Sequence, residues 1–247
     1  MPADLTHTLI VLPAYNEEEA IAATLAEIAA KLPGAHTLVV NDGSADQTAA
    51  IARQHGAAVA SFPFNMGVGA AMRFGFRYAL SHGFANVIQL DADGQHDPAY
   101  VPQLLAQLDQ HDLVIGARFA GEGSYSVSGP RKWAMQLLSA VISSTAKTKL
   151  TDTTSGFRAS GPRAVAMFAN DYPAEYLGDT VESLVTGLRA GLSVTQVPVA
   201  MRARAGGQPS QNAWRSTVFL FRAMVALAFA YIRPKPSVDD MAALERA

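Results

Sequence analysis

The chain has 247 residues, of which 49% are hydrophobic and 16% are charged, so it can bury a large core and is not a disordered chain. Its 19 basic and 21 acidic residues nearly balance, which gives no overall positive charge to attract nucleic acid. Cysteine is absent, which excludes disulfides, zinc–thiolate sites and cysteine nucleophiles. Residues 1–7 lack a secretory signal pattern, so we expect a cytoplasmic location.

Strand and helix patterns alternate along the first half of the chain. Apolar runs predict strands at 8–12, 37–40, 57–60, 86–90 and 113–115, and helical spacing predicts helices at 17–31, 46–55, 67–82 and 98–110. Repeated units of this length predict an α/β fold, with a Rossmann-like and mainly parallel sheet that carries helices on both faces. Ligands bind at the carboxyl ends of such strands, so we expect the polar loops there to form one site.

The regular alternation ends after residue 116. We expect a loop at 116–129, helices at 130–148 and 173–190, a strand at 192–199 and a second loop at 203–212. The segment 217–232 is apolar apart from Arg222 but shorter than the about 20 residues needed to cross a bilayer. We interpret it as an amphipathic helix on a membrane surface, with packing on the protein's own core as the alternative. The chain then divides into a catalytic domain at 1–211 and a C-terminal amphipathic helix and tail at 212–247.

Two carboxylates directly follow the apolar strand at 86–90. Asp91 and Asp93 are spaced so that both can reach one divalent ion, directly or through water. Magnesium and manganese prefer such oxygen ligands and leave positions for substrate phosphates. A D-x-D pattern alone is more often a solvated turn, but its place at a strand end among other polar loops favours a metal site.

Three other loops are open to a structural or a functional interpretation. Asp42 could accept hydrogen bonds from a nucleobase or ribose, or the loop could only cap the next helix. The segment 13–17 could bind a ligand or only end a strand at Pro13 and start a helix at Glu17. The glycines at 65–69 allow close backbone approach to a ligand or tight helix–sheet packing. Neither a P-loop nor a dinucleotide-binding G-x-G-x-x-G pattern is present.

Six motifs occur in an order that belongs to one enzyme family. They are Pro13-Ala-Tyr-Asn-Glu-Glu18, Asn41-Asp-Gly-Ser-Ala-Asp46, Asn65-Met-Gly-Val-Gly-Ala70, Gln89-Leu-Asp-Ala-Asp-Gly-Gln95, Gly116-Ala-Arg118 and Asp152-Thr-Thr-Ser-Gly-Phe-Arg158. With them the chain resembles the family 2 glycosyltransferases over residues 8–210. The last two motifs are similar to those of the branch that contains dolichyl-phosphate mannose synthase and bacterial polyprenyl-phosphate sugar transferases.

The resemblance implies a GT-A fold, a nucleotide-diphosphate sugar as donor, with a UDP-sugar preferred, and Mg²⁺ or Mn²⁺ as cofactor. It implies that the nucleotide sugar is bound by Pro13, Ala14, Tyr15, Glu17, Asp42, Asn65, Gly67, Asp91 and Ala92. Asp91, Asp93 and Gln95 would hold the metal and the diphosphate. The acceptor phosphate would face Arg118, Arg131 and Arg202, to which we add the neighbouring Arg204. We expect Asp93, Asp152 and Arg118 to be catalytic.

The acceptor decides which of these residues the chemistry needs. A phosphate monoester is largely a dianion at neutral pH, so it needs cations to position it rather than a strong base. A hydroxyl acceptor needs a carboxylate base, for which Asp152, Asp179 and Glu182 are candidates. All three could instead be structural, and Asp152 could also orient the acceptor and the arginines.

We therefore expect an inverting, metal-dependent glycosyltransferase that moves a sugar to polyprenyl phosphate, peripheral on the inner face of the cell membrane. Residues 201–247 carry seven basic and three acidic residues, which suits an anionic membrane surface. The alternatives are a soluble transferase with a hydroxyl acceptor and a non-catalytic nucleotide-sugar binder. A small membrane protein as partner and a homo-oligomer are left open, and no nucleic acid partner is expected.

Overall fold

The computed structural model describes residues 5–118, 139–173 and 179–202. A seven-stranded sheet in the order β3-β2-β1-β4-β6-β5-β7 forms its centre. The strands are β1 Thr8–Ala14, β2 His36–Asn41, β3 Ala58–Ser61, β4 Asn86–Gln89, β5 Leu113–Ala117, β6 Arg158–Ser160 and β7 Val194–Pro198. The helices are α1 Ile21–Lys31, α2 Thr48–Gln54, α3 Val68–Ser81, the 3-10 turn η1 Pro98–Tyr100, α4 Val101–Gln107, α6 Pro162–Asp171 and α7 Asp179–Arg189.

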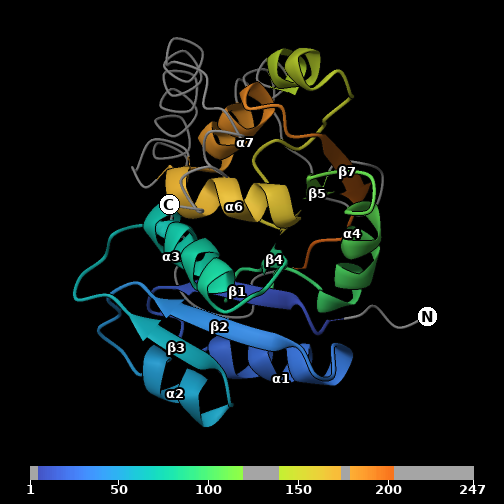
Figure 1. Ribbon diagram of the computed structural model, residues 1–247. Coiled ribbons are helices and arrows are strands. Elements are labelled where there is room, and N and C mark those ends of the chain that lie inside the picture. The colour runs from blue at the N-terminus through green and yellow to red at the C-terminus, as the bar shows by residue number, and fades with distance from the viewer. Residues whose placement is uncertain (1–4, 119–138, 174–178, 203–247) are drawn as a thin grey trace, which may run out of the picture.

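Helices cover both faces of the sheet, as the sequence predicts (Figure 1). Strand β1 is buried on both faces. Leu9 and Val11 belong to the hydrophobic cluster between the sheet and α3, α6 and α7. Ile10 and Leu12 belong to the cluster between the sheet and α1, α2 and α4. Successive side chains of a strand point to opposite faces, so a central parallel strand needs a continuous apolar run. The expected three-layer α/β architecture is confirmed.

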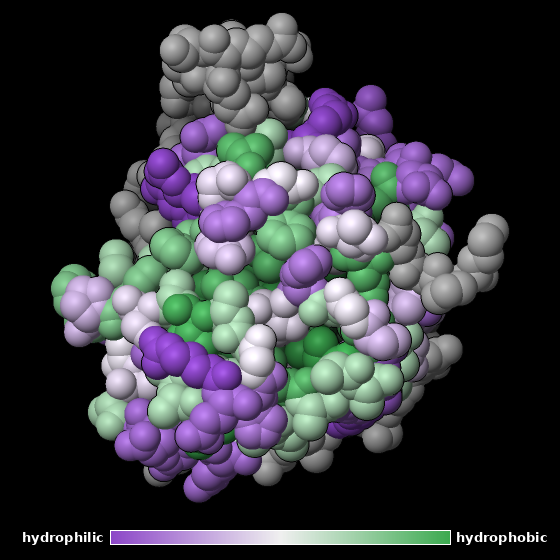
Figure 2. All heavy atoms as spheres, turned by 60° about the horizontal axis from the view of Figure 1, so that its bottom comes forward, coloured by the Kyte–Doolittle hydropathy of each residue, from purple (hydrophilic) through white to green (hydrophobic). Residues whose placement is uncertain are grey.

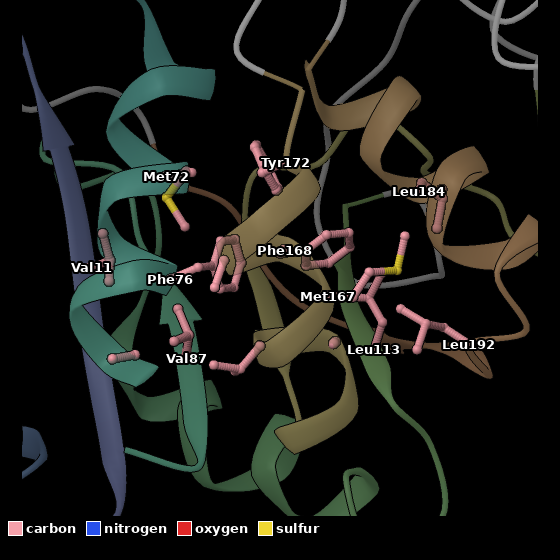
Figure 3. Close-up of a cluster of buried hydrophobic side chains, with 14 of the residues drawn as sticks. Val11, Met72, Phe76, Val87, Leu113, Met167, Phe168, Tyr172, Leu184 and Leu192 are labelled. Atoms are coloured by element: carbon pink, nitrogen blue, oxygen red, sulfur yellow. The ribbon is translucent and has the colours of Figure 1, made fainter. Parts of the chain in front are cut away.

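The cluster on the α3 side joins the two halves of the sheet. Figure 3 shows Phe76 of α3 and Phe168 of α6 directed toward each other, with Tyr172 beside them. The ring centroids of Phe76 and Phe168 are 5.2 Å apart, and those of Phe76 and Tyr172 are 5.3 Å apart. Such tilted pairs add stabilisation beyond the area that they bury. The core therefore holds α3 and α6 together above the centre of the sheet.

Strand β6 runs antiparallel to both of its neighbours, β4 and β5, while every other pair in the sheet is parallel. Its first residue, Arg158, lies opposite Gln89 near the end of β4 and opposite Ile115 in β5. Because β6 is reversed, the segment that leads into it reaches the edge where the parallel strands end. The motif at 152–158 is thereby delivered to the predicted site.

Several predicted boundaries were wrong. Pro13 does not end the first strand but lies within it, opposite Val40 of β2, because proline can occupy a strand where its missing N–H is not needed. Helix α1 begins at Ile21 rather than Glu17, and α4 ends at Gln107 after an opening 3-10 turn. Residues 159–172, for which the sequence patterns predict no element, contain most of β6 and all of α6.

The predictions beyond residue 116 are tested only in part. Residues 139–146 are helical, which confirms the end of the predicted helix at 130–148. The C-terminal helix and tail, residues 212–247, lie outside the described residues. Within the described ranges, no helix has the length and hydropathy needed to span a bilayer. Figure 2 turns the underside of Figure 1 toward the viewer and shows hydrophobic side chains near its centre and hydrophilic ones along its lower left margin.

Candidate active site

The loops after β1 and β2 are joined by hydrogen bonds. Asn16, in a left-handed backbone conformation with φ of 53°, donates its backbone N–H to Ser44 Oγ at 2.9 Å. Its side-chain Oδ1 accepts the backbone N–H of Ala45, also at 2.9 Å. The backbone N–H of Glu17 donates to Thr48 Oγ1 at 2.8 Å. The two motifs that the sequence places 28 residues apart therefore form one rigid wall of the edge.

The predicted donor-binding residues of this wall differ in exposure. Pro13 and Ala14 are the last two residues of β1, and Ala14 is buried. The side chain of Tyr15 is 49% exposed, whereas Glu17 is only 9% exposed. An exposed tyrosine at the strand end can stack on a planar ligand group, while the buried Glu17 helps to shape the loop.

Asp42 anchors the loop that leads into α3. Its Oδ1 accepts the backbone N–H of Met66 at 2.7 Å, and its Oδ2 accepts that of Gly67 at 2.8 Å. The contact needs Gly43, since a Cβ there would lie 2.4 Å from the carbonyl carbon of Phe64. The structure thus brings Asp42 together with Asn65 and Gly67, as predicted. Each carboxylate oxygen has a second lone pair, so Asp42 can still accept a bond from a ligand.

The Asp91–Gln95 loop passes along α1. Thr24 Oγ1 donates to the carbonyl oxygen of Ala92 at 3.1 Å, and the backbone N–H of Gln95 donates to Asp93 Oδ1 at 3.0 Å. Asp93 is 5% exposed, whereas the side chain of Asp91 is 41% exposed. The loop therefore presents one buried and one solvent-facing carboxylate beside an amide.

This donor set fits a divalent ion that also binds phosphate. Among the described residues, no three His, Cys, Asp or Glu side chains gather into a cage that could hold a metal alone. Magnesium is typically bound by one or two carboxylates together with waters and substrate phosphates. Asp91, Asp93 and the amide oxygen of Gln95 match that pattern, which requires the diphosphate of a donor to complete it.

Arg118 and Asp152 form a two-pronged ion pair. Arg118 directly follows β5, and Asp152 begins the segment that leads into β6. Arg118 Nε lies 2.6 Å from Asp152 Oδ2 and Arg118 Nη2 lies 2.8 Å from Oδ1. Oδ2 also accepts the backbone N–H of Arg118 at 3.0 Å, and Oδ1 accepts the hydroxyl of Thr154 at 3.2 Å. Asp152 is 1% exposed. All four of its acceptor positions are used, so this carboxylate fixes the guanidinium in place.

A family model described as glycosyl transferase family 2 matches residues 9–172. The chain belongs to this family. An undecaprenyl-phosphate mannosyltransferase of Micrococcus luteus is 33% identical over 217 residues, which cover 83% of this chain and 87% of that protein. A polyprenol monophosphomannose synthase of Mycolicibacterium smegmatis is 34% identical over 167 residues, 62% of this chain and 60% of that protein. The expected branch of the family is confirmed.

Solved structures show the fold of this glycosyltransferase. Glucosyl-3-phosphoglycerate synthase from Mycobacterium tuberculosis, in complex with Mn²⁺, UDP and glucosyl-3-phosphoglycerate, superposes with a TM-score of 0.69 at 23% identity. The match covers 92% of this chain and 80% of that one. The predicted GT-A fold is confirmed.

The glycosyltransferase holds Arg202 in an ion cluster with Glu27 and Lys31 of α1 and with Asp97. Arg202 Nη1 lies 2.8 Å from both carboxylate oxygens of Glu27, and Nη2 pairs with Asp97. Lys31 Nζ lies 2.7 Å from each of the same two carboxylates. Its Nη1 and Nη2 nitrogens thus contact carboxylates far away in the sequence, and its side chain is still 38% exposed.

The charges in this cluster shift one another's pKa. Burial raises the pKa of Glu27, but hydrogen bonds from Lys31 and Arg202 outweigh it, so the pKa lies below its ordinary value. The pKa of Asp97 is lowered in the same way, with burial opposed by bonds from Lys31 and from the backbone N–H of Ala99. Hydrogen bonding to Glu27, partly opposed by burial, raises the pKa of Arg202.

The remaining candidates are placed as follows. Arg131 and Arg204 lie outside the described residues. Arg158, the last residue of the 152–158 motif, is buried and donates to the carbonyl oxygens of Thr153 and Ser155 at 3.0 and 2.9 Å, so it shapes the loop that follows Asp152. Glu182 in α7 is 8% exposed.

Several residues outside the predicted set support the motifs. Thr48 and Thr154 bond to loop atoms across the edge, and His96, which is 4% exposed, lies directly behind Asp91. In the sequence, His96 directly follows Gln95, the last residue of the motif at 89–95, and this position indicates a role near Asp91 and Asp93.

Proposed function

We propose that this glycosyltransferase moves a sugar from a nucleotide-diphosphate sugar to polyprenyl phosphate, with inversion at the anomeric carbon and with Mg²⁺ or Mn²⁺. The observation that carries the proposal is the Arg118–Asp152 pair, a fixed guanidinium on the same sheet edge as Asp91 and Asp93. The names of the relatives in Micrococcus luteus and Mycolicibacterium smegmatis, which specify undecaprenyl phosphate and a polyprenol product, support the same acceptor.

The state of Asp152 favours a phosphate over a hydroxyl as the acceptor. A hydroxyl must lose a proton to a base, but the acceptor positions of Asp152 are filled by Arg118 and Thr154. A phosphate dianion needs no such base, only a cation that holds it. Arg118 supplies a planar cation, the guanidinium group. Its side chain is 20% exposed, and Asp152 holds it in one orientation.

The donor would lie between the Asp42 wall and the Asp91–Gln95 loop. Tyr15 and Asp42 would contact the nucleoside, and Asp91, Asp93 and Gln95 would hold the ion. A bound divalent ion stabilises the negative charge of a leaving diphosphate as a Lewis acid. In the transfer itself, a phosphate oxygen held by Arg118 forms a bond to the anomeric carbon. The bond from that carbon to the diphosphate breaks, and its electron pair leaves with the nucleoside diphosphate.

The donor nucleotide, the sugar and the membrane contact are parts of this proposal. We take a UDP-sugar as the first choice, and the mannosyltransferase names of the relatives make mannose donors the next to test. The basic and apolar segment at 212–247 would hold the enzyme peripherally at the cytoplasmic face. A membrane protein partner and self-association remain predictions.

A product assay tests the proposal. The purified full chain is incubated with polyprenyl phosphate, a panel of UDP- and GDP-sugars and Mg²⁺ or Mn²⁺, and the lipid phase is analysed by mass spectrometry. We expect a sugar-phosphate lipid that disappears with EDTA and with Asp93→Ala but persists with Asp109→Ala, a control at an exposed carboxylate. Transfer to a hydroxyl acceptor in place of the lipid would refute the acceptor, and the same lipid product in EDTA would refute the metal.

A further inference from the structure

The imidazole of His96 contacts both the backbone and the side chain of Asp91. The backbone N–H of Asp91 donates to His96 Nδ1 at 3.1 Å. The other ring nitrogen, Nε2, lies 3.6 Å from Asp91 Oδ2. A neutral ring that accepts a bond at Nδ1 carries its proton on Nε2, so an N–H group faces the carboxylate. At 3.6 Å that contact is electrostatic, whereas the bond at Nδ1 is a true hydrogen bond.

The ring of His96 is itself held by the protein. Its side chain is 2% exposed, and it stacks on Phe157 with ring centroids 5.0 Å apart and planes inclined by 19°. Its backbone pairs with Met201 in an isolated antiparallel bridge. The imidazole therefore has one fixed position, and it can transmit that position to Asp91.

A second constraint acts on the other carboxylate oxygen of Asp91. A Cβ added at Gly156 would lie 3.3 Å from Asp91 Oδ1 and 3.3 Å from Gln89 Nε2, tighter than ordinary van der Waals contact. The absence of a side chain at Gly156 therefore leaves room for the carboxylate. Asp91 lies between His96 on one side and the backbone of the 152–158 motif on the other.

We infer that His96 is a positioning residue for the metal-binding carboxylate of Asp91 and that it acts chiefly through Nδ1. The inference deepens the proposed function and rests on its metal site. Side chains that hold a metal ligand in place typically change metal affinity about 10- to 100-fold when they are replaced. The bond at Nδ1 fixes the backbone from which the Asp91 side chain extends, so its loss lets the carboxylate move out of line with Asp93.

Two substitutions separate the ring nitrogens. In His96→Asn, the amide oxygen occupies the place of Nδ1 and can still accept the Asp91 N–H, but nothing replaces Nε2. In His96→Gln, an amide N–H can replace Nε2, but the acceptor near the backbone is lost. His96→Leu removes both groups at similar volume. Gly156→Ala disturbs the carboxylate from the opposite side. Val39→Ala, in the hydrophobic cluster that contains Phe157, is the control for lost stability.

The measurement is Mn²⁺ binding to the full chain in the presence of UDP, followed through the electron paramagnetic resonance signal of free Mn²⁺. We expect the Mn²⁺ dissociation constant to rise about 10- to 100-fold in His96→Gln and His96→Leu and to stay within about threefold in His96→Asn. Gly156→Ala should also weaken binding. Val39→Ala should lower the unfolding temperature without changing the dissociation constant. Thermal unfolding without metal shows that each variant is folded.

Results that would contradict the role of His96 differ from those that would contradict the metal site. Wild-type affinity in His96→Leu, or equal weakening in His96→Asn and His96→Leu, would overturn the role of Nδ1 while leaving the metal site in place. Failure of the wild-type chain to bind Mn²⁺ with UDP would overturn the metal site, and the inference with it. A split in kinetics adds a second readout: His96→Gln should need more metal for half-maximal rate, and its rate should recover at saturating metal.

Discussion

Replacing Gly43 by alanine tests how tightly the loop after β2 packs on the loop before α3. Gly43 has φ of +72°, and an added Cβ would lie 2.4 Å from Phe64 C and 2.7 Å from Asn65 N. Carbon atoms in contact are normally about 3.5–4.0 Å apart, so the 64–67 loop must retreat by about 1 Å. That shift would stretch the bonds from Met66 and Gly67 to Asp42, which are 2.7 and 2.8 Å long.

The expected cost follows from these contacts. The left-handed conformation costs alanine about 1 kcal/mol, and each hydrogen bond to a charged group contributes about 1.5–3 kcal/mol. With partial relaxation of the loop, we expect Gly43→Ala to lower the free energy of unfolding by about 3–5 kcal/mol. Gly34→Ala and Gly83→Ala are matched controls because their φ angles are +83° and +74° and nothing lies within 4 Å of the new Cβ. They should cost only about 1 kcal/mol.

Equilibrium unfolding in urea measures the difference, and titration with UDP follows the site. Gly43→Ala should bind UDP more weakly than either control, because Asp42 and the loop that it anchors form one wall of the edge. If Gly43→Ala destabilises the protein no more than Gly34→Ala does, the two loops are not in the close contact described and the reasoning fails.

Two further predictions concern the charged groups. Arg118→Lys loses the two-pronged bond and should slow transfer to lipid phosphate about 10- to 100-fold at an unchanged donor KM. An unaltered transfer rate in this variant would refute the acceptor role. Asp152→Asn should lower the free energy of unfolding by about 3 kcal/mol, because it leaves the guanidinium of Arg118 without its charged partner. Because the pKa of Glu27 is lowered in the fold, its pairing with Arg202 stabilises the protein above pH 4.5, the ordinary pKa of this group, and this contribution is lost as the pH falls through the lowered value. The stability gap between wild type and Glu27→Gln should be about 0.5–1 kcal/mol at pH 7, since the pair is partly exposed, and a gap that does not narrow as the pH is lowered progressively below 4.5 would contradict the ion pair.

The first half of the fold could be predicted from sequence because its strands are buried on both faces and its helices have one apolar face. Strand β6 could not be predicted, since its three residues, Arg158-Ala-Ser160, have no periodicity and become a strand only between β4 and β5. Helix α6, in contrast, carries a helical signal in its sequence. It has Pro162 at its first turn and buried residues at helical spacing, Ala164, Val165, Met167 and Phe168.

The arrangement of the candidate site could be predicted where one short segment carries its side chains, as in Asp91 to Gln95. It was not predictable where a side chain finds its partner far along the chain. Asp42 bonds to Met66 and Gly67 through space, and Arg202 pairs with Glu27, 175 residues away. Spacing along a sequence shows which charges exist, but only the fold decides which of them neutralise each other.

The reversed strand also sets the order in which the enzyme can assemble. Strands β1 to β4 follow one another through local strand–helix connections, and they can pair as soon as each is made. Strands β4 and β5 are consecutive along the chain but never touch, because β6 lies between them. The sheet must therefore wait for residue 160 before its two halves join. Long-range pairings of this kind form slowly, so we expect a folding intermediate in which β1 to β4 are paired and β4 has not yet joined β6 and β5.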